Sequence, residues 1–345
     1  MTEIISERIA ILRILMICGV VLLHVPPYVP LADVGSGNFD FLKAFFQSAV
    51  FRCTVPVLTV ISGYLLFSAN LDRAPRKLFV KKFNTLAIPF LVFNTSLAGV
   101  VYVIQSKVSL PITYQLAPFD LGVMLDAAFG LTQSPLNYPL NFIRDLFVLA
   151  MLAPALGVML RQAALPGLAL VALIFGLDLD SYLLLRWDMA VLFYVGGMAA
   201  LQKWDLCCLD KYAVAFLALF VSLCVIVIKL KITNTTFLRL AAPFLIWPSA
   251  SLLYNTRSGR WLSSLSKYSY FIFLAHGLIL VITWMVYKKL PFVLPYPFYW
   301  ILAPLITVVM LINTHRLGYV LFPIAFAWMI GQRVDREKGV RVIPT

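Results

Sequence analysis

Apolar runs of about 20 residues recur along the whole chain, and they limit its fold more than any other feature. A helix of about this length spans roughly 30 Å, which is the thickness of the hydrocarbon core of a bilayer. Since 62% of the residues are hydrophobic and only 12% are charged, the composition excludes an ordinary soluble protein. The chain is therefore predicted to be an all-α, polytopic membrane helical bundle whose first apolar run is retained as an anchor.

We expect about ten membrane-spanning helices, and the second apolar run is too long for one straight crossing. Its beginning, FDFLKAFFQSAVF, is expected to lie obliquely, and Pro56 to bend the helix after it. The expected spans cover roughly residues 9–25, 41–68, 84–104, 140–160, 165–177, 188–202, 212–230, 239–254, 268–287 and 298–313.

The distribution of Lys and Arg predicts the orientation. With the N-terminus in the cytoplasm, the cytoplasmic segments hold 17 of these residues and the outer segments hold seven, which favours an N-in and C-in arrangement. Residues 1–316 form the expected transmembrane domain. Residues 317–345 are expected to form a cytoplasmic, amphipathic tail at the interface, and an eleventh span over 317–331 is the alternative.

Neither the net charge nor the cysteines indicate a different class of protein. The formal charge of +13 is an orientation signal, and nucleic acid is not an expected partner. The five cysteines show no metal-ligand spacing, so we expect no metal site and no structural disulfide.

Two polar residues lie within the first apolar run. Arg13 and His24 are eleven residues apart, or about three helical turns, so they share one helix face and lie about 16 Å apart along its axis. This places a cation about 8 Å and an imidazole about 24 Å from the inner edge of the membrane. Ionisable groups at such depths are costly and mark functional sites more often than not.

Other polar residues are expected at related depths. Arg52, Arg144 and Asp145 share the outer third with His24, whereas His276 lies about 12 Å from the cytoplasmic side. Arg144 and Asp145 are sequence neighbours and are expected to need separate partners.

The spans hold three arginines but only one clear acidic residue, so backbone carbonyls, water or an anionic ligand must satisfy the others. We favour an anionic ligand because the loop at 70–85, NLDRAPRKLFVKKFNT, would attract one to the cytoplasmic mouth. Its five cations are Arg73, Arg76, Lys77, Lys81 and Lys82. The alternative is that these cations only set the orientation of the protein in the membrane. For SGYLL (62–66), the alternative is that its small residues only allow close helix packing.

These residues resemble the motifs of the acyltransferase-3 family of membrane acyltransferases. The matching stretches occur in the family's order over nearly the whole chain. They are RILMICGVVLLH (13–24), RCTVPVLTVISGYLLF (52–67), KKFNTLAIPF (81–90), FIRDLFVLAMLAP (142–154) and SYFIFLAHGL (269–278). Two features depart from the family pattern: the stretch LNYPLNFIRD lacks a common Trp-Phe, and no fused extracytoplasmic domain is present.

The resemblance implies a multi-pass enzyme of the bacterial inner membrane. It would move a succinyl or acetyl group from cytoplasmic acyl-CoA to a sugar hydroxyl of an exopolysaccharide or a polyprenyl-linked oligosaccharide. No tightly bound cofactor is implied. Membrane lipids are expected partners, and a homodimer is one option for the oligomeric state.

The resemblance also suggests roles for individual residues. His24 would be the general base, and Asp145 would orient its ring. Arg52 or Arg144 would stabilise the oxyanion or bind a carboxylate on the acyl group, and the spare arginines favour succinyl over acetyl. Arg13 and the five cations of the 70–85 loop would bind the phosphates of CoA. Tyr64, Asn141 and His276 are further candidates for substrate binding.

The rival function is a transporter or flippase of an anionic or polyprenyl-linked solute, because helices with buried arginines would serve it too. The sequence shows neither the repeat symmetry nor the paired broken helices that are typical of transporters.

Overall fold

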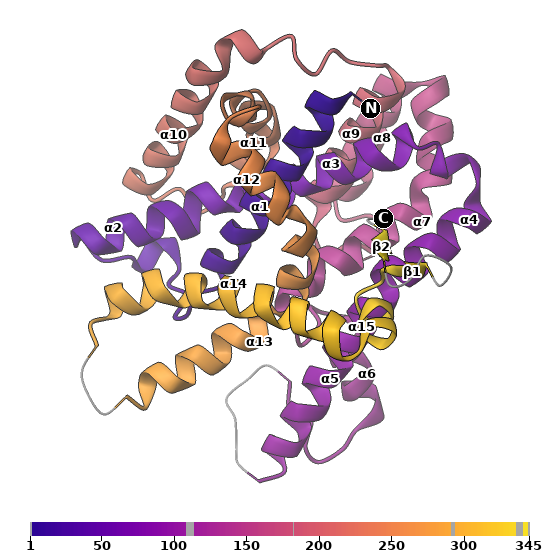
Figure 1. Ribbon diagram of the computed structural model, residues 1–345. Coiled ribbons are helices and arrows are strands. Elements are labelled where there is room, and N and C mark those ends of the chain that lie inside the picture. The colour runs from indigo at the N-terminus through magenta and orange to yellow at the C-terminus, as the bar shows by residue number, and fades with distance from the viewer. Residues whose placement is uncertain (1, 108–113, 182, 291–293, 336–340, 344–345) are drawn as a thin grey trace.

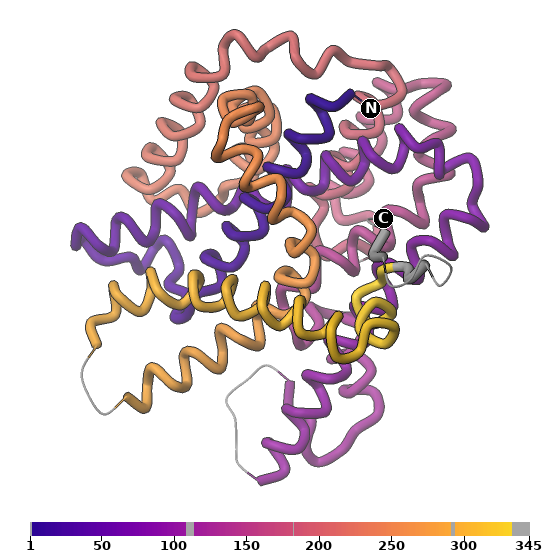
Figure 2. The backbone as a smooth tube through the Cα atoms, in the orientation of Figure 1, coloured from indigo at the N-terminus to yellow at the C-terminus, as the bar shows by residue number. Residues whose placement is uncertain are grey.

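The computed structural model describes residues 2–107, 114–181, 183–290, 294–335 and 341–343. This part of the chain forms α-helices joined by short 3-10 and π-helical turns, and one pair of antiparallel strands (Figures 1 and 2). The elements are α1 (Glu3–Leu23), α2 (Asn38–Ala44), α3 (Thr54–Ser68), α4 (Pro75–Lys82), α5 (Ile88–Gln105), α6 (Leu121–Phe129), α7 (Asn141–Gln162), α8 (Ala164–Gly176), α9 (Trp187–Leu201), α10 (Ala213–Lys229), α11 (Thr236–Ser249), α12 (Arg257–Leu265), α13 (Ser269–Lys288), α14 (Tyr296–Leu321), α15 (Pro323–Met329), β1 (Arg333–Asp335) and β2 (Arg341–Ile343).

Seven helical runs in the described residues are long and apolar enough to cross a membrane, which fits the predicted polytopic helical bundle. Two further apolar helices, α8 and α9, are shorter, and α1 has 21 residues but carries Glu3, Glu7, Arg8 and Arg13. The total of about ten spans and their orientation therefore stay predictions. The runs are Asn38–Ser68, Pro75–Gln105, Tyr138–Gln162, Asp210–Lys229, Thr236–Leu253, Arg257–Lys288 and Tyr296–Leu321.

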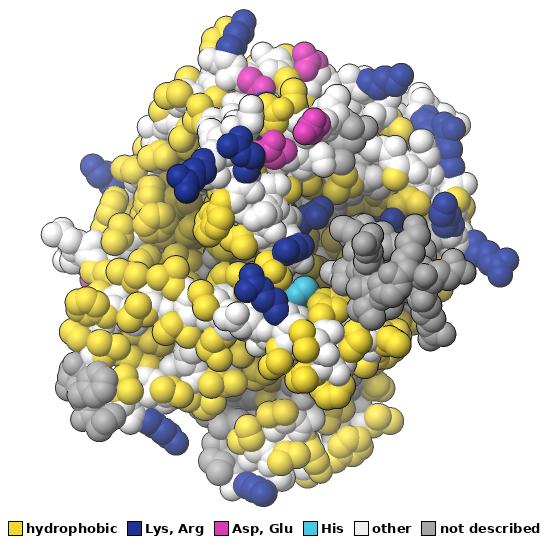
Figure 3. Space-filling model, in the orientation of Figure 1, with side chains coloured by type: hydrophobic (Ala, Val, Ile, Leu, Met, Phe, Trp, Pro, Cys, Tyr) yellow, Lys and Arg dark blue, Asp and Glu magenta, His cyan; other side chains and the backbone are white. Residues whose placement is uncertain are grey.

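Hydrophobic side chains cover much of the outer surface. Leu165, Leu230 and Val320 are each more than two-thirds exposed, and Figure 3 shows broad apolar areas around a centre where Lys, Arg and one His gather. Apolar surface of this extent is a typical sign of contact with lipid.

The run Asn38–Ser68 is not one regular α-helix. A π-helical turn at Phe45–Ala49 and a 3-10 turn at Val50–Cys53 separate α2 from α3. Pro56 lies in the first turn of α3, where the backbone N–H that proline lacks has no partner within the helix. The run is therefore interrupted by a change of helix type before Pro56, and the expected bend at Pro56 stays a prediction.

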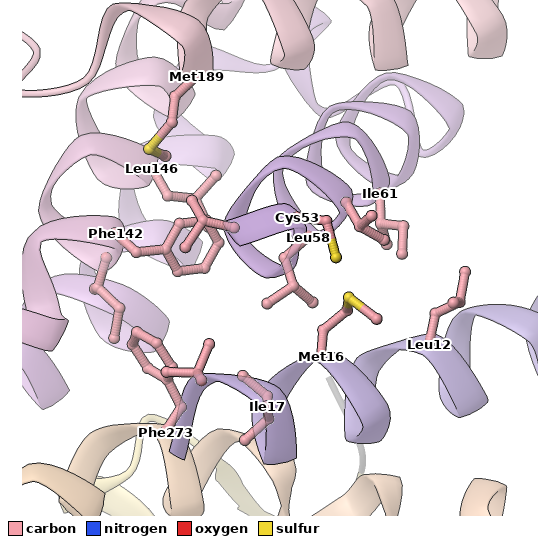
Figure 4. Packing of buried hydrophobic residues seen from close by; sticks show 14 of the residues in the cluster. Leu12, Met16, Ile17, Cys53, Leu58, Ile61, Phe142, Leu146, Met189 and Phe273 are labelled. Atoms are coloured by element: carbon pink, nitrogen blue, oxygen red, sulfur yellow. The ribbon is translucent and has the colours of Figure 1, made fainter. Parts of the chain in front are cut away.

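Helix α1 lies at the centre of the bundle. Its buried residues face several directions, and it packs against α3, α12, α13 and α14. Figure 4 shows Met16 of α1 close to Cys53, and Ile17 on the side of α1 that faces Phe273 of α13. The part of α1 after Arg13 has no charged residue on any side, as expected for a helix in the interior of a bundle, so its central position follows from its sequence.

Small residues bring α3 and α9 into close contact. A Cβ added at Gly63 would clash with the backbone carbonyl of Phe193, and one added at Gly196 would clash with that of Val60. The glycine of the SGYLL stretch therefore lets two helix backbones approach, as the packing interpretation of this motif predicts.

Two buried ion pairs tie the ends of helices to loops. Arg8 is 2% exposed and pairs with both carboxylate oxygens of Asp210, which joins the start of α1 to the turn before α10. Arg161 near the end of α7 pairs with Asp72 at 2.6 Å, in the turn after α3.

Residues 114–136 form a small folded unit around α6. Asp126 accepts hydrogen bonds from the backbone and hydroxyl of Thr132, at 2.8 and 2.9 Å, and from the Tyr114 hydroxyl at 3.1 Å. Partial burial acts to raise the pKa of Asp126, but these hydrogen bonds outweigh it, and its pKa lies below the usual value. The fixed loop geometry is therefore favoured at neutral pH.

The C-terminal region differs in its boundaries from the prediction. Helix α14 continues to Leu321, so the expected domain boundary at residue 316 falls inside a helix. Helix α15 has seven residues and spans only about 11 Å, which is too short for an eleventh crossing. Residues 336–340 and 344–345 of the predicted tail lie outside the described residues, and its cytoplasmic location stays a prediction.

Candidate functional site

The end of α1 is held in place by side chains from the next helical run. The last carbonyls of a helix have no hydrogen-bond donor within the helix, and at the end of α1 the side chain of Gln47 supplies a donor. Its amide donates to the carbonyls of Leu22 at 3.0 Å and Val25 at 3.1 Å, and Lys43 donates to that of Pro27 at 2.8 Å. Gln47 is 3% exposed, and this buried amide was not identified as a site residue from the sequence. His24, the C-cap residue of α1, therefore has a fixed backbone.

His24 lies beside a second histidine from α13. The Nδ1 atom of His24 is 2.8 Å from the carbonyl oxygen of Val20 and 3.4 Å from Nε2 of His276. The Nδ1 atom of His276 is 2.8 Å from the carbonyl oxygen of Phe273 and 3.2 Å from that of Ile272. His276 is fully buried, whereas His24 is partly buried.

These contacts assign the protons on both neutral rings. A carbonyl oxygen can only accept, so each ring nitrogen that faces one must carry the hydrogen. Nδ1 of His276 is therefore the donor, and its Nε2 keeps a lone pair directed at His24. Nδ1 of His24 is likewise the donor, which leaves Nε2 of His24 with its lone pair free. This tautomer of His24 is the one that a general base needs at Nε2.

The contact between the two histidines corrects the predicted depths, which placed them about 12 Å apart along the membrane normal. The predicted depth of His276 assumed a span starting at residue 268. In the structure a polar helix, α12, and a 3-10 turn precede α13, and the 3.4 Å contact places both rings at one level of the bundle.

Aromatic and basic residues surround the exposed side of His24. The ring of Tyr138 lies edge-on to His24 at 6.2 Å between centroids and is 61% exposed. The guanidinium of Arg52 lies close enough for its charge to act on His24, and it donates to the Tyr28 hydroxyl at 2.6 Å. The backbone next to Tyr138 is fixed, because the N–H of Asn137 donates to the side-chain oxygen of Asn94 at 2.8 Å.

Asp145 has different partners from those predicted. It is fully buried and accepts hydrogen bonds from Arg144 at 2.8 Å and from the backbone of Leu185 at 3.2 Å. The expectation that Arg144 and Asp145 need separate partners is wrong, because the long Arg144 side chain reaches back to its neighbour. Among the described residues, the ring contacts of His24 are with Val20, His276 and Tyr138, and none is with Asp145.

Arg144 joins three segments. Besides its contact with Asp145, it donates to the carbonyls of Gly130 and Leu183, at 2.9 and 2.8 Å. These bonds fix the loops before α7 and before α9, so Arg144 has a structural role. Arg52 is then the cation near His24 that is more available to a substrate.

Arg13 is partly buried and makes no hydrogen bond or ion pair with any residue that the structure describes. It lies three turns before His24 on α1, so a long anionic ligand could contact both positions. The predicted phosphate-binding cations lie on and next to α4, where Arg73, Arg76 and Lys77 are exposed and Lys81 and Lys82 are partly exposed.

Comparison with known proteins identifies the family. The model of the acyltransferase-3 family, described as an acyltransferase domain, matches residues 7–339. The chain belongs to the acyltransferase-3 family. It is similar to the succinoglycan biosynthesis protein ExoH of Rhizobium meliloti (strain 1021), with 33% identity over 97% of this chain and 94% of that protein. No solved structure matches the chain.

Two further predicted residues of this acyltransferase-3 protein lie away from the histidine pair. Tyr64 lines a cavity of about 420 Å³ between α1, α3, α9 and α11, together with Ile9, Trp204 and Trp247. Asn141 begins α7, is 8% exposed, and donates to the Ser134 hydroxyl at 3.0 Å. Among the described contacts, neither residue touches His24 or His276.

Proposed function

We propose that this acyltransferase-3 protein is an O-acyltransferase that uses His24 as its general base. The observation that carries the proposal is the contact of His24 Nδ1 with the Val20 carbonyl, which assigns a free lone pair to Nε2 of a ring that lies beside Tyr138. The proposed donor is cytoplasmic acyl-CoA, and the proposed acceptor is a sugar hydroxyl of an exopolysaccharide or a polyprenyl-linked oligosaccharide. The name of the similar ExoH protein supports a polysaccharide acceptor.

The reaction follows from the roles of a few groups. His24 Nε2 takes the proton of the sugar hydroxyl while that oxygen attacks the thioester carbonyl carbon. Arg52 stabilises the negative charge that develops on the carbonyl oxygen. Collapse of the tetrahedral intermediate breaks the carbon–sulfur bond, and protonated His24 returns its proton to the CoA thiolate. The products are a sugar ester and free CoA.

His276 takes the orienting part that was expected of Asp145. The Val20 carbonyl takes the Nδ1 hydrogen of His24 at 2.8 Å and so fixes the tautomer, while the Nε2 lone pair of His276, 3.4 Å from the same nitrogen, stabilises the imidazolium that forms during the reaction. A buried partner that stabilises the imidazolium is a general feature of catalytic histidines.

The donor would approach from the cytoplasmic side. In an N-in arrangement of about ten spans within a bacterial inner membrane, the start of α1 and all of α4 face the cytoplasm. The cations of α4 and Arg13 would bind the phosphates of CoA, and its long arm would run along α1 toward His24. The separation of about 16 Å between Arg13 and His24 suits an extended arm.

Analysis of the cell's polysaccharide with and without the gene tests the proposed reaction. We expect deletion to remove one ester substituent while the amount of exported polymer stays the same, because decoration is separate from export. The substituent is identified by mass spectrometry after mild alkaline release. Loss of export with normal decoration of the remaining polymer would instead support a transporter or flippase.

A further inference from the structure

Three arginines from distant parts of the chain gather on the outer side of the bundle. We call Arg52, Arg186, Arg239 and Asp188 the outer arginine cluster. Arg186 directly precedes α9, Asp188 is in its first turn, and Arg239 is in the first turn of α11. Arg52 and Arg186 both lie close enough for their charges to act on Arg239. From the sequence, Arg186 and Arg239 are expected only as outer cations and not as site residues.

The charges within the outer arginine cluster do not balance. Asp188 is 1% exposed, and one of its oxygens, Oδ2, lies 3.5 Å from Arg239 and 3.6 Å from Arg186. These distances exceed the 2.7–2.9 Å or so of a charge-assisted hydrogen bond, and within the described residues Oδ2 has no hydrogen-bond partner. One carboxylate therefore faces the guanidinium groups of Arg186 and Arg239 without a close bond to either of them.

The donors of the arginines are also incompletely used. Nε of Arg239 is buried and has no hydrogen-bond partner in the described part of the chain, while its Nη2 donates to the Thr236 hydroxyl at 3.0 Å. The side chains of Arg186 and Arg239 are 27% and 23% exposed, so a ligand can reach them from outside. Unpaired guanidinium donors in a partly buried site favour an anion with two oxygens in one plane.

The outer arginine cluster adjoins the proposed reaction site. The turn that carries Arg52, Val50–Cys53, packs against both α1, which ends at His24, and α11, which carries Arg239, and Tyr138 lies next to His24. An anion held between Arg186 and Arg239 would therefore be near the ester that forms at His24. This proximity suggests that the bound anion is part of a substrate.

We propose that the outer arginine cluster binds a substrate carboxylate and so selects for substrates that carry one. The proposal rests on the proposed acyl transfer and adds the residues that set its specificity. Asp188 holds Arg186 and Arg239 side by side, and the incoming carboxylate takes the donors that Asp188 does not bond. The carboxylate could belong to a dicarboxylic acyl group or to a uronic acid of the acceptor glycan.

A crossed transfer assay distinguishes these two sources. Purified protein is given succinyl-CoA or acetyl-CoA, each with a neutral or a uronic-acid-containing oligosaccharide, and kcat/KM is measured for all four pairs. We expect Arg186→Gln and Arg239→Gln to lower the preference for the carboxylate-bearing substrate by about tenfold or more. Arg239→Lys, which keeps the charge but loses the planar fork, should fall between wild type and Arg239→Gln.

The matched control is Lys289→Gln, which removes an exposed outer cation from the loop after α13, and it should leave the preference unchanged. A change in preference between donors assigns the carboxylate to the acyl group, and a change between acceptors assigns it to the glycan. Either result supports the proposal. An equal loss for all four pairs, or no loss for any, would overturn it.

A binding measurement separates this proposal from the proposed reaction. Monomethyl succinate and methyl glucuronide carry the two candidate carboxylates, and saturation-transfer NMR detects their binding without turnover. At least one should bind the wild type and the His24→Gln variant but not Arg239→Gln. Transfer that survives in His24→Gln would contradict the proposed base, whereas binding that survives in Arg239→Gln would contradict the anion site.

Discussion

Replacing His24 with alanine is expected to lower kcat for acyl transfer by about 10²- to 10⁴-fold, the range attributed to a general base. The free Nε2 lone pair of His24 accepts the hydroxyl proton in the proposed mechanism, and the structure shows no other imidazole with a free nitrogen at the exposed edge of the described site. The measurement is the rate of ester formation by purified protein with acyl-CoA and an oligosaccharide acceptor.

His315→Gln is the matched control for the loss of a histidine. His315 packs among Tyr268, Phe271, Tyr319 and Phe326, and among the described contacts it touches neither His24 nor His276. The His24→Ala protein should unfold at nearly the wild-type temperature in detergent, because His24 is only partly buried and its side chain caps no other segment. Transfer at the wild-type rate by folded His24→Ala protein would rule out the general-base role.

His276→Leu is expected to lower kcat by about 10²-fold and to leave the KM values for donor and acceptor nearly unchanged. Leucine fills a similar volume but cannot accept a hydrogen bond, so the His24 imidazolium loses the lone pair that stabilises it, while the Val20 carbonyl still fixes the tautomer. The expected split between kcat and KM follows because His276 touches His24 rather than a substrate. Steady-state kinetics with both substrates varied measures it.

His276→Gln tests whether His276 positions His24 through a hydrogen bond or only fills space in the bundle. The side-chain oxygen of glutamine can reach the place of the His276 Nε2 atom and accept the same hydrogen bond, so this variant should recover a clear part of the lost kcat. Equal losses in His276→Leu and His276→Gln, or a rise in KM at constant kcat, would show that His276 acts in packing or in substrate binding instead.

The architecture could be predicted because its cause is local. Long apolar runs predict spanning helices from composition and length, and the family motifs agree with that interpretation. The length of Asn38–Ser68 indicates that it is not one regular spanning helix, but the turns that interrupt it could not be predicted, because a change from α to π or 3-10 geometry has no strong sequence signal.

The contents of the site were harder to predict because they depend on contacts between distant helices. Equal depth suggested Asp145 as the partner of His24, yet depth says nothing about the direction in which a helix faces its neighbours. Arg144 instead bonds Asp145, and α13 brings His276 within 3.4 Å of His24. The outer arginine cluster combines residues from three separate elements. No spacing within one span could have indicated it.

The most direct test of the proposed mechanism is a density map of the protein with a non-transferable acyl-CoA analogue, in which a thioether replaces the thioester. We expect the CoA phosphates near Arg13 and the cations of α4, with the reacting end of the arm beside Nε2 of His24. A map that shows the arm ending away from His24, or the nucleotide bound on the outer side, would contradict this mechanism.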